Sequence, residues 1–258
     1  MPNYIPAFIG GGAIVLLLCL TLLPSLLRSN TGRTQTESRV RNYYASEVHD
    51  AVLRRAFAEV FEKEPSEFTA EDYQSVRRIA FRKENDYLTW MEVGFADGSE
   101  TRVPMLHNTT DTIELDGTDF QAFPMLEELD TATAAGYDVS LSFHSSEYTN
   151  TLGNLKHLKK LYLSNVGNSR GPAEFAELFA DPASIEALDG VYLYQQEDIK
   201  ELMRYFPKLR ELRVGWRNDE VSLAELKDLK ELESLTATLR LKGNEDILEL
   251  TQLKALDI

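Results

Sequence analysis

Apolar residues recur in the second half of this chain at intervals of three, three and two positions. The pattern occurs five times, and the sets begin 30, 21, 23 and 21 residues apart. The sets are Leu155, Leu158, Leu161 and Leu163; Ile185, Leu188, Val191 and Leu193; Phe206, Leu209, Leu212 and Val214; Leu229, Leu232, Leu235 and Ala237; and Leu250, Leu253, Leu256 and Ile258. The last two positions of each set alternate as in a strand. Each unit therefore predicts a short strand, followed by a turn and a helix or loop.

Two less regular sets precede these five. They are Tyr73, Val76, Ile79 and Phe81, and then Phe123, Leu126, Leu129 and Thr131. The spacing resembles that of the leucine-rich repeat family, in which one unit cannot bury its apolar side alone and neighbours stack into a solenoid. The resemblance implies an α/β fold with parallel strands on a concave side and helices or loops on a convex side. It also implies a protein that binds other molecules rather than one that catalyses.

The segment before the first set is similar to the helical N-terminal cap of bacterial, internalin-like leucine-rich repeat proteins. Its apolar positions have helical spacing at Val52, Leu53, Ala56, Phe57, Val60 and Phe61. Pro65 then interrupts the pattern. In the cap, a short helix is followed by Leu-Thr-x-x-Asp and the first strand; here Phe68 replaces the leucine, whereas Thr69 and Asp72 match. Thr69 and Asp72 also have the spacing of a helix cap.

One feature of regular leucine-rich repeats is missing. These repeats carry an asparagine three residues after the last strand leucine, and its side chain ties one turn to the next. The corresponding positions here hold Val166, Gln196, Arg217 and Arg240. We therefore do not expect an asparagine ladder, although Asn165 and Asn218 lie one residue away.

Residues 82–121 interrupt the repeats and predict a hairpin insertion. Two runs of alternating apolar residues flank Asp97-Gly98, which is a strong hairpin signal; the runs are Met91, Val93 and Phe95, and then Val103 and Met105. Short strands are also predicted at 113–115 and 139–143. Helices on the convex side are expected at 172–180, 197–205, 223–232 and 246–253. Residues 43–121 then form a helical cap with the insertion, and residues 122–258 form the repeats.

The first 42 residues predict a membrane anchor and a linker. The run from Ile5 to Leu27 is 23 residues without a charge, enough for a helix to cross a hydrocarbon core of roughly 30 Å. A cleaved signal peptide is the alternative, but no basic residue precedes the run and no small-x-small cleavage site follows it. We therefore predict a single transmembrane anchor at 1–27 and a flexible polar linker at 28–42.

Charge around the span predicts its orientation. Arginines follow the span and no basic residue precedes it, so the positive-inside rule places the C-terminal domain in the cytoplasm. The resemblance to internalin-like proteins favours an extracellular domain instead, and both orientations stay open.

The net charge of the chain bears on its partners. It is −15, and residues 1–42 carry four arginines against one glutamate, so the remaining chain has a net charge of −18. A domain this acidic repels phosphate backbones, and we expect no nucleic-acid partner. The single cysteine, Cys19, excludes a disulfide within the chain.

No motif for catalysis or metal binding is recognisable. No phosphate-binding glycine loop and no Gly-x-Ser-x-Gly elbow occurs, and the histidines are scattered at His49, His107, His144 and His157. Four aspartates lack calcium-binding spacing and predict turns: Asp97, Asp111, Asp116 and Asp119. We expect no catalytic residue, cofactor or metal. An enzyme, or a regulator of one, with a site in 82–121 is the alternative of another class.

Partner-binding residues follow from strand geometry. If the leucines point into the core, the residues between them point to the concave side. Stacking the units in register then makes Tyr162, Tyr192 and Arg213 neighbours, with Tyr194 and Trp216 nearby. Tyrosine, tryptophan and arginine dominate binding hot spots. Aromatic residues also favour strands for reasons unrelated to binding, and that interpretation stays open.

The sequence thus predicts a membrane-anchored leucine-rich repeat module that binds a protein or peptide through its concave face. An outward-facing protein for adhesion or surface recognition is the alternative within the same class. The last set of apolar residues also predicts weak self-association, because a solenoid needs its final apolar side covered.

Overall fold

The computed structural model describes residues 47–85, 88–106, 113–131, 139–142, 152–163, 170–216, 221–237, 247 and 249–257. These residues all belong to one compact unit, Tyr44–Ile258. The predicted anchor and linker lie outside the described residues. Within the described part of the chain, no helix has the length and apolar character to cross a membrane.

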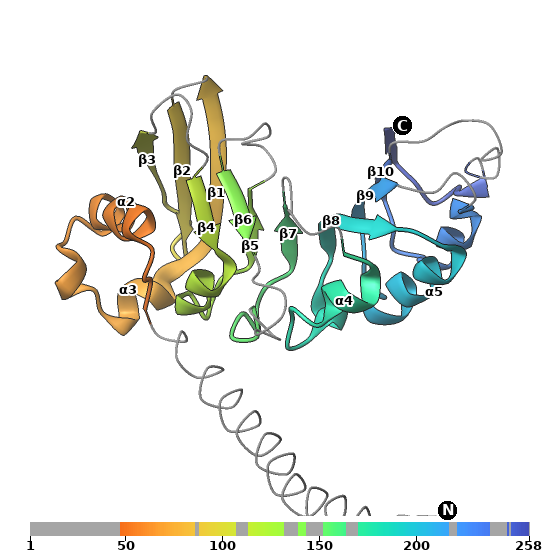
Figure 1. Ribbon diagram of the computed structural model, residues 1–258, viewed down its shortest axis with the longest axis horizontal. Coiled ribbons are helices and arrows are strands. Elements are labelled where there is room, and N and C mark those ends of the chain that lie inside the picture. Colours follow the sequence, from red (N-terminus) through yellow and green to blue (C-terminus); the bar gives the residue numbers. More distant parts are fainter. Residues whose placement is uncertain are drawn as a thin grey trace, which may run out of the picture. The chain divides into compact units, whose positions relative to one another are not determined.

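The structure is a mixed α/β fold built on one large sheet (Figure 1). Its α-helices are α2 (Ala51–Phe61), α3 (Ala70–Ser75), α4 (Pro172–Ala176) and α5 (Gln196–Tyr205). Short 3-10 helices are η1 (Pro65–Glu67), η2 (Gly117–Ala122), η4 (Pro182–Ser184) and η5 (Leu223–Asp228). The strands are β1 (Val76–Asn85), β2 (Leu88–Phe95), β3 (Glu100–Leu106), β4 (Ile113–Asp116), β5 (Glu128–Asp130), β6 (Val139–Ser142), β7 (Lys160–Tyr162), β8 (Ala187–Leu193), β9 (Glu211–Trp216), β10 (Ser234–Ala237) and β11 (Ala255–Asp257).

The main sheet is open and mostly parallel. Its nine strands have the order β11-β10-β9-β8-β7-β5-β1-β2-β3, and only the pairs β1–β2 and β2–β3 are antiparallel. One apolar residue from each parallel strand lies in a single row across the sheet: Ile79, Leu129, Leu161, Leu188, Leu212, Leu235 and Leu256. All are fully buried except Leu256, which is 41% exposed. The predicted strands and their inward positions are therefore confirmed for most of the apolar sets. Strands β4 and β6 form a separate parallel pair.

The predicted alignment of the second apolar set is wrong by three residues. The spacing aligned Val191 with Leu161 and Leu212, but in the sheet Leu188 takes that place and Val191 pairs with Val214. The ladder shifts register between Asp189 and Val191. Gly190 lies there with a φ of 98°, which a residue with a side chain adopts only under strain. The extra residue is a β-bulge, and a spacing rule that assumes a regular strand misses it.

A single apolar core lies on one face of the sheet. It joins the row described above to side chains from α2, α4, α5 and η5, such as Phe57, Phe175, Leu202 and Leu226. Because side chains alternate along each strand, the residues between the buried ones point to the opposite face. That face carries mostly polar side chains, and we call it the polar face.

The predicted cap forms its helix, with one correction. Asp50 begins α2 by accepting hydrogen bonds from the backbone N–H groups of Val52 and Leu53. Thr69 and Asp72 make the reciprocal capping bonds at the start of α3, as predicted. Val52 was expected on the apolar side of α2, but it is 43% exposed, because the buried side of the helix follows Leu53, Ala56, Phe57 and Val60 and Val52 lies outside that helical spacing.

A buried aspartate fixes the start of this cap. Asp119, on η2, accepts hydrogen bonds from the backbone N–H groups of His49 (2.7 Å) and Asp50 (3.1 Å). Burial raises the pKa of Asp119, and these two hydrogen bonds oppose the rise. The segment just before α2 is thereby attached to a loop 70 residues further along the chain.

The predicted hairpin is confirmed and belongs to the main sheet. Strands β2 and β3 join through a turn in which Gly98 has a φ of 83°, and β2 pairs along the whole of β1. The hairpin thus extends the parallel sheet at one edge. Of the predicted convex helices, α5 forms nearly as expected, α4 is shorter, 223–232 contains the 3-10 helix η5, and 246–253 is described only in part.

Candidate functional site on the polar face

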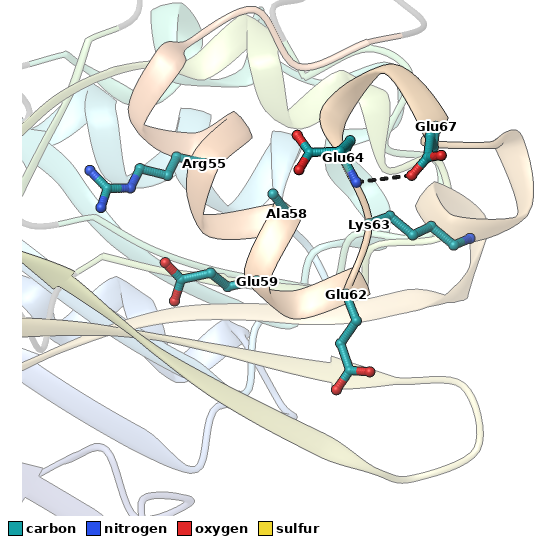
Figure 2. Close-up of a pocket in the computed structure, with 7 residues that line it drawn as sticks. All are labelled: Arg55, Ala58, Glu59, Glu62, Lys63, Glu64 and Glu67. Atoms are coloured by element: carbon teal, nitrogen blue, oxygen red, sulfur yellow. Dashed lines mark hydrogen bonds between the residues drawn. The ribbon is translucent and has the colours of Figure 1, made fainter.

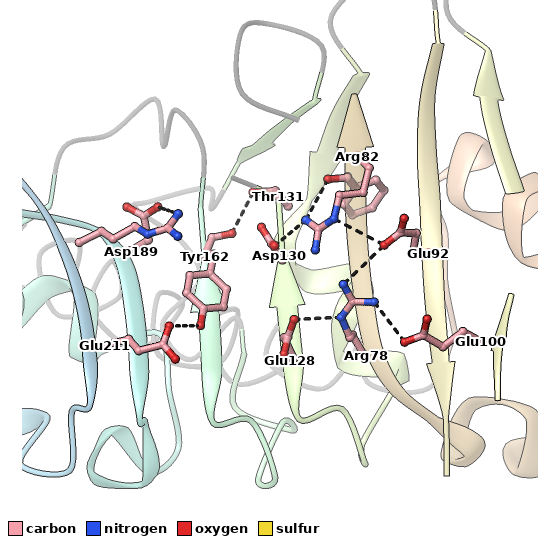
Figure 3. A network of polar contacts seen from close by, with 12 residues as sticks. Arg78, Arg82, Glu92, Glu100, Glu128, Asp130, Thr131, Tyr162, Asp189 and Glu211 are labelled. Carbon is pink, nitrogen blue, oxygen red and sulfur yellow. Dashed lines mark hydrogen bonds and ion pairs between the residues drawn. The ribbon is translucent and has the colours of Figure 1, made fainter. Parts of the chain in front are cut away.

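The polar face divides into two halves with different side chains. The hairpin half lies on β1, β2, β3 and β5 and consists of Arg78, Arg82, Glu92, Glu100, Arg102, Glu128 and Asp130. The central half lies on β7, β8 and β9 and consists of Tyr162, Asp189, Tyr192, Tyr194, Glu211 and Arg213. Figure 3 shows the labelled members of both halves projecting from neighbouring strands.

Arg78 connects four strands in the hairpin half. Its Nε lies 3.0 Å from Oε1 of Glu128, and its terminal nitrogens lie 3.5 Å from Glu92 and 3.6 Å from Glu100 (Figure 3). Burial alone lowers the pKa of Arg78, but the hydrogen bond to Glu128 and the three negative charges raise it overall. One guanidinium therefore links β1 to β5, β2 and β3.

Arg82, four residues further along β1, makes similar contacts. Its Nη1 donates to Oδ2 of Asp130 at 2.6 Å, and its Nε lies 3.5 Å from Glu92. The Asp130 side chain is only 8% exposed, so the guanidinium compensates for a nearly complete loss of solvent.

The outer part of the hairpin carries a cation–π contact. The guanidinium of Arg102 lies 4.4 Å from the centre of the Trp90 ring and 3.8 Å from Glu92. The Trp90 indole donates a hydrogen bond to Glu84. All described charged residues of β2 and β3 thus take part in ion pairs, and this arrangement indicates a structural role for these charges.

Tyr162 and Arg213 lie together in the central half, as predicted. The Tyr162 hydroxyl donates to Oε2 of Glu211 at 2.8 Å, and the Arg213 guanidinium lies 5.4 Å from the centre of the Tyr162 ring. Burial and the neighbouring Glu211 raise the pKa of Tyr162. The phenol is therefore a hydrogen-bond donor at neutral pH, and its ring is largely covered, with 8% of the residue exposed.

Asp189 is a functional candidate that the sequence did not predict. It pairs across the ladder with Arg213, and their closest charged atoms, Oδ2 and Nη1, lie 3.8 Å apart. Burial raises its pKa to about 6; the Arg213 charge and a hydrogen bond from the Gly190 backbone oppose the rise, and the charge of Asp130 adds to it. The Asp-Gly dipeptide within a strand pattern was the signal for this site, since an isolated glycine there indicates a bulge.

Tyr192 and Tyr194 form a second aromatic group. Their rings are stacked, with centres 6.5 Å apart and planes inclined by 27°. Tyr192 pairs with Gly215, and a Cβ at Gly215 would lie 2.5 Å from the Tyr192 ring, closer than atoms can approach. The ring therefore lies directly on the glycine backbone. Tyr194 is fixed through its backbone N–H, which donates to Asp198 at 2.6 Å, and the residue stays 36% exposed.

Four of the five predicted partner-binding residues thus fall into two groups instead of one. Tyr162 lies with Arg213, and Tyr192 lies with Tyr194. The prediction that Tyr192 is next to Arg213 is wrong in detail, because the bulge at Gly190 places Asp189 opposite Arg213. Trp216 pairs with Leu193 through its backbone, and its side chain lies outside the described residues.

The surface around α2 and η1 is hollowed but offers no organised site. Its lining is mostly acidic: Arg55, Ala58, Glu59, Glu62, Lys63, Glu64 and Glu67 (Figure 2). In Figure 2 the glutamate side chains spread apart, and Lys63 forms an ion pair with Asp72 at 2.7 Å outside the hollow. The side chains here do not converge on a common point.

Among the described residues, no group of three or more His, Cys, Asp or Glu side chains could hold a metal ion. Two of the four aspartates considered for calcium have the predicted turn role, since Asp97 accepts from Ser99 and Asp116 accepts from Thr118. Asp111 lies outside the described residues. Comparison of the chain with protein-family models, curated proteins and solved structures finds no match.

Proposed function

We propose that this chain is a membrane-anchored leucine-rich repeat protein whose polar face binds an extended segment of another protein. The observation that carries the proposal is the row of aligned residues on successive parallel strands. From Leu161 onward these residues are separated by 27, 24, 23 and 21 positions, within the range of leucine-rich repeats. In such repeats the face opposite the packed core is the usual binding surface.

A glutamine supports the repeat assignment at a position where regular repeats have asparagine. Gln196 follows the last strand leucine, Leu193, by three residues. Its amide nitrogen donates to the backbone carbonyl of Ser222 at 3.1 Å, and its amide oxygen accepts from the Ser222 N–H at 2.8 Å. The side chain thus ties one turn to the next, which is the role of the asparagine ladder.

The composition of the central half favours binding over a purely structural role. Tyrosine and arginine are the residue types that contribute most at protein interfaces. The backbone of the exposed Tyr194 is held by its hydrogen bond to Asp198, so a partner that covers the ring does not have to order the main chain there.

The binding proposal is tested by selecting peptides from a random library displayed on phage against the full-length chain in detergent. We expect the selected peptides to lose affinity for a variant with Thr236→Arg on the polar face. They should keep their affinity for a variant with Lys200→Glu, an exposed change on α5. Selected peptides that depend on Lys200 and ignore Thr236 would contradict the proposal.

The anchor proposal has its own test. If the run from Ile5 to Leu27 spans the bilayer, the full-length protein should stay in the membrane fraction during carbonate extraction. Recovery of a soluble form beginning after Leu27 would contradict it. Protease treatment of intact cells then distinguishes the cytoplasmic orientation, which the flanking arginines favour, from an outward-facing adhesion protein.

A further inference from the structure

Asp189 and the tyrosine pair lie side by side on the polar face. On β9, Arg213 pairs with Asp189, and Gly215, two positions further along β9, pairs with Tyr192. Positions two apart on a strand point to the same face and are about 7 Å apart along it, so the β8 residues opposite Arg213 and Gly215 also share one face. A carboxylate therefore borders the stacked rings of Tyr192 and Tyr194, which we call the tyrosine platform.

The tyrosine platform is held in place before any ligand arrives. The Tyr192 ring occupies the space beside Gly215 of β9, where a Cβ would come within 2.5 Å of the ring. Asp198 fixes the backbone of Tyr194 from the start of α5. Rigid aromatic rings of this kind contribute contact area at a low entropic cost.

The chemistry of this site favours a cation. The faces of tyrosine rings carry negative potential and attract ammonium and guanidinium groups. The Asp189 carboxylate has about four acceptor positions, and its ion pair with Arg213 is longer than a hydrogen bond, at 3.8 Å. The Arg213 guanidinium is shared between Asp189 and the Tyr162 ring, whose centre lies 5.4 Å away, and it makes no close hydrogen bond to the carboxylate. The net charge of −18 for residues 43–258 also draws basic partners towards the domain.

We propose that the tyrosine platform and Asp189 together bind a lysine or arginine side chain of the extended segment that the polar face receives. The inference rests on the proposed function and specifies its partner, a basic segment of a protein. An acidic or phosphorylated segment is disfavoured, because its charge would meet Asp189 and the negative ring faces.

The test measures binding of defined peptides to the full-length chain in detergent by fluorescence anisotropy. The probes are fluorescein-labelled peptides of about twelve residues that alternate serine with lysine, with glutamate or with glutamine. We expect the lysine peptide to bind at least tenfold more tightly than the other two. Tyr194→Ala and Asp189→Asn should each weaken it about tenfold, whereas Tyr194→Phe, which keeps the ring, should change it less than twofold.

A matched charge control distinguishes binding at this site from general electrostatic attraction between the basic peptide and the acidic domain. Glu231→Gln removes one negative charge at an exposed position outside the polar face, and it should change the affinity less than twofold. Equal losses with Asp189→Asn and Glu231→Gln, or no preference for the lysine peptide, would overturn the inference. If the glutamine or glutamate peptide binds best and Tyr194→Ala weakens it, the polar face still binds peptides and only the basic partner is refuted. If none of the three binds, the inference fails, and the library selection decides the proposed function separately.

Discussion

The hairpin half and the central half of the polar face differ in how fully they compensate charges that are partly removed from water. Both place charged side chains on a sheet face that is partly removed from water. In the hairpin half, Arg78 and Arg82 each contact at least two carboxylates, with hydrogen bonds of 3.0 Å to Glu128 and 2.6 Å to Asp130. In the central half, Asp189 has its guanidinium at 3.8 Å, and burial leaves its pKa near 6.

This difference separates charges that stabilise the fold from charges that serve another purpose. A partly buried carboxylate with several close, well-oriented donors is compensated for its lost hydration, whereas one that is compensated less, as the raised pKa of Asp189 indicates, lowers the free energy of unfolding. Because functional sites can be kept at a cost in stability, the central half is where we expect binding. Each prediction below tests this distinction or the core on which both halves rest.

The largest effect should come from the core beneath both halves. Leu161→Ala and Leu212→Ala each remove a fully buried side chain from the row that crosses the sheet. Each should lower the free energy of unfolding by about 2–5 kcal/mol, through lost burial and the cavity left behind. Denaturant titration of residues 44–258 measures it, and Lys156→Ala, at an exposed position, should change it by less than about 0.5 kcal/mol. Similar small effects at all three positions would refute the alignment of the repeats.

A smaller effect should come from the ion pairs of the hairpin half. Arg82→Met keeps the length of the side chain and removes the guanidinium from the buried Asp130 carboxylate, and it should cost about 1.5–3 kcal/mol of stability. Arg102→Met is the matched control, because Arg102 also pairs with Glu92 but is half exposed, and it should cost less than about 1 kcal/mol. Both variants should bind the lysine peptide as tightly as the wild type. A loss of binding with unchanged stability would instead make the hairpin half part of the site.

In the central half, Asp189→Asn should raise the free energy of unfolding, whereas Arg82→Met lowers it in the hairpin half. The pKa of Asp189 is about 6 in the folded protein and 3.8 in the unfolded chain, so the folded state holds this proton more strongly. The contribution of Asp189 to the free energy of unfolding therefore falls as pH rises from about 4 to about 6 and stays low above that. At pH 7.5 we expect Asp189→Asn to be more stable than the wild type by about 1–2 kcal/mol, less than the full shift implies, because the amide must also be desolvated.

The pH dependence of that difference is the sharper measurement. Denaturant titrations at pH 4 and pH 7.5 should show the gain only at the higher pH, since Asp189 is already neutral in the folded protein at pH 4. Asp72 supplies the contrast: its hydrogen bonds and the Lys63 charge lower its pKa against the effect of burial, so Asp72→Asn should destabilise the protein at pH 7.5. A loss of stability with Asp189→Asn at pH 7.5 would show that the central half is as well compensated as the hairpin half.

Sequence spacing predicted the strands and their buried residues well, because a regular apolar interval reports directly on which side chains share a face. It failed where the backbone departs from regularity. The bulge at Gly190 moved Asp189 into line with Arg213, and no interval of leucines records one extra residue in a strand. The role of Gln196 was missed for a different reason, since its longer side chain reaches the same backbone groups as the expected asparagine.

The two edge strands of the sheet, β3 and β11, also differ, since only β3 carries features that prevent pairing with another strand. This difference predicts a weak self-association, the smallest of the expected effects. Strand β3 carries Pro104 and the charged Glu100, features that prevent pairing with another strand, and α2 lies beside it. Strand β11 pairs only with β10 in the described part of the chain, and Leu256 is 41% exposed there.

We therefore expect residues 44–258 to self-associate weakly through β11. Covering the exposed part of Leu256 contributes about 1 kcal/mol, so Leu256→Lys should weaken the association roughly fivefold in sedimentation velocity across a concentration series. Glu100→Lys, on the opposite edge, should leave it unchanged. A strict monomer at the highest concentration, or an equal response to both substitutions, would show that β11 is no more prone to pairing than β3.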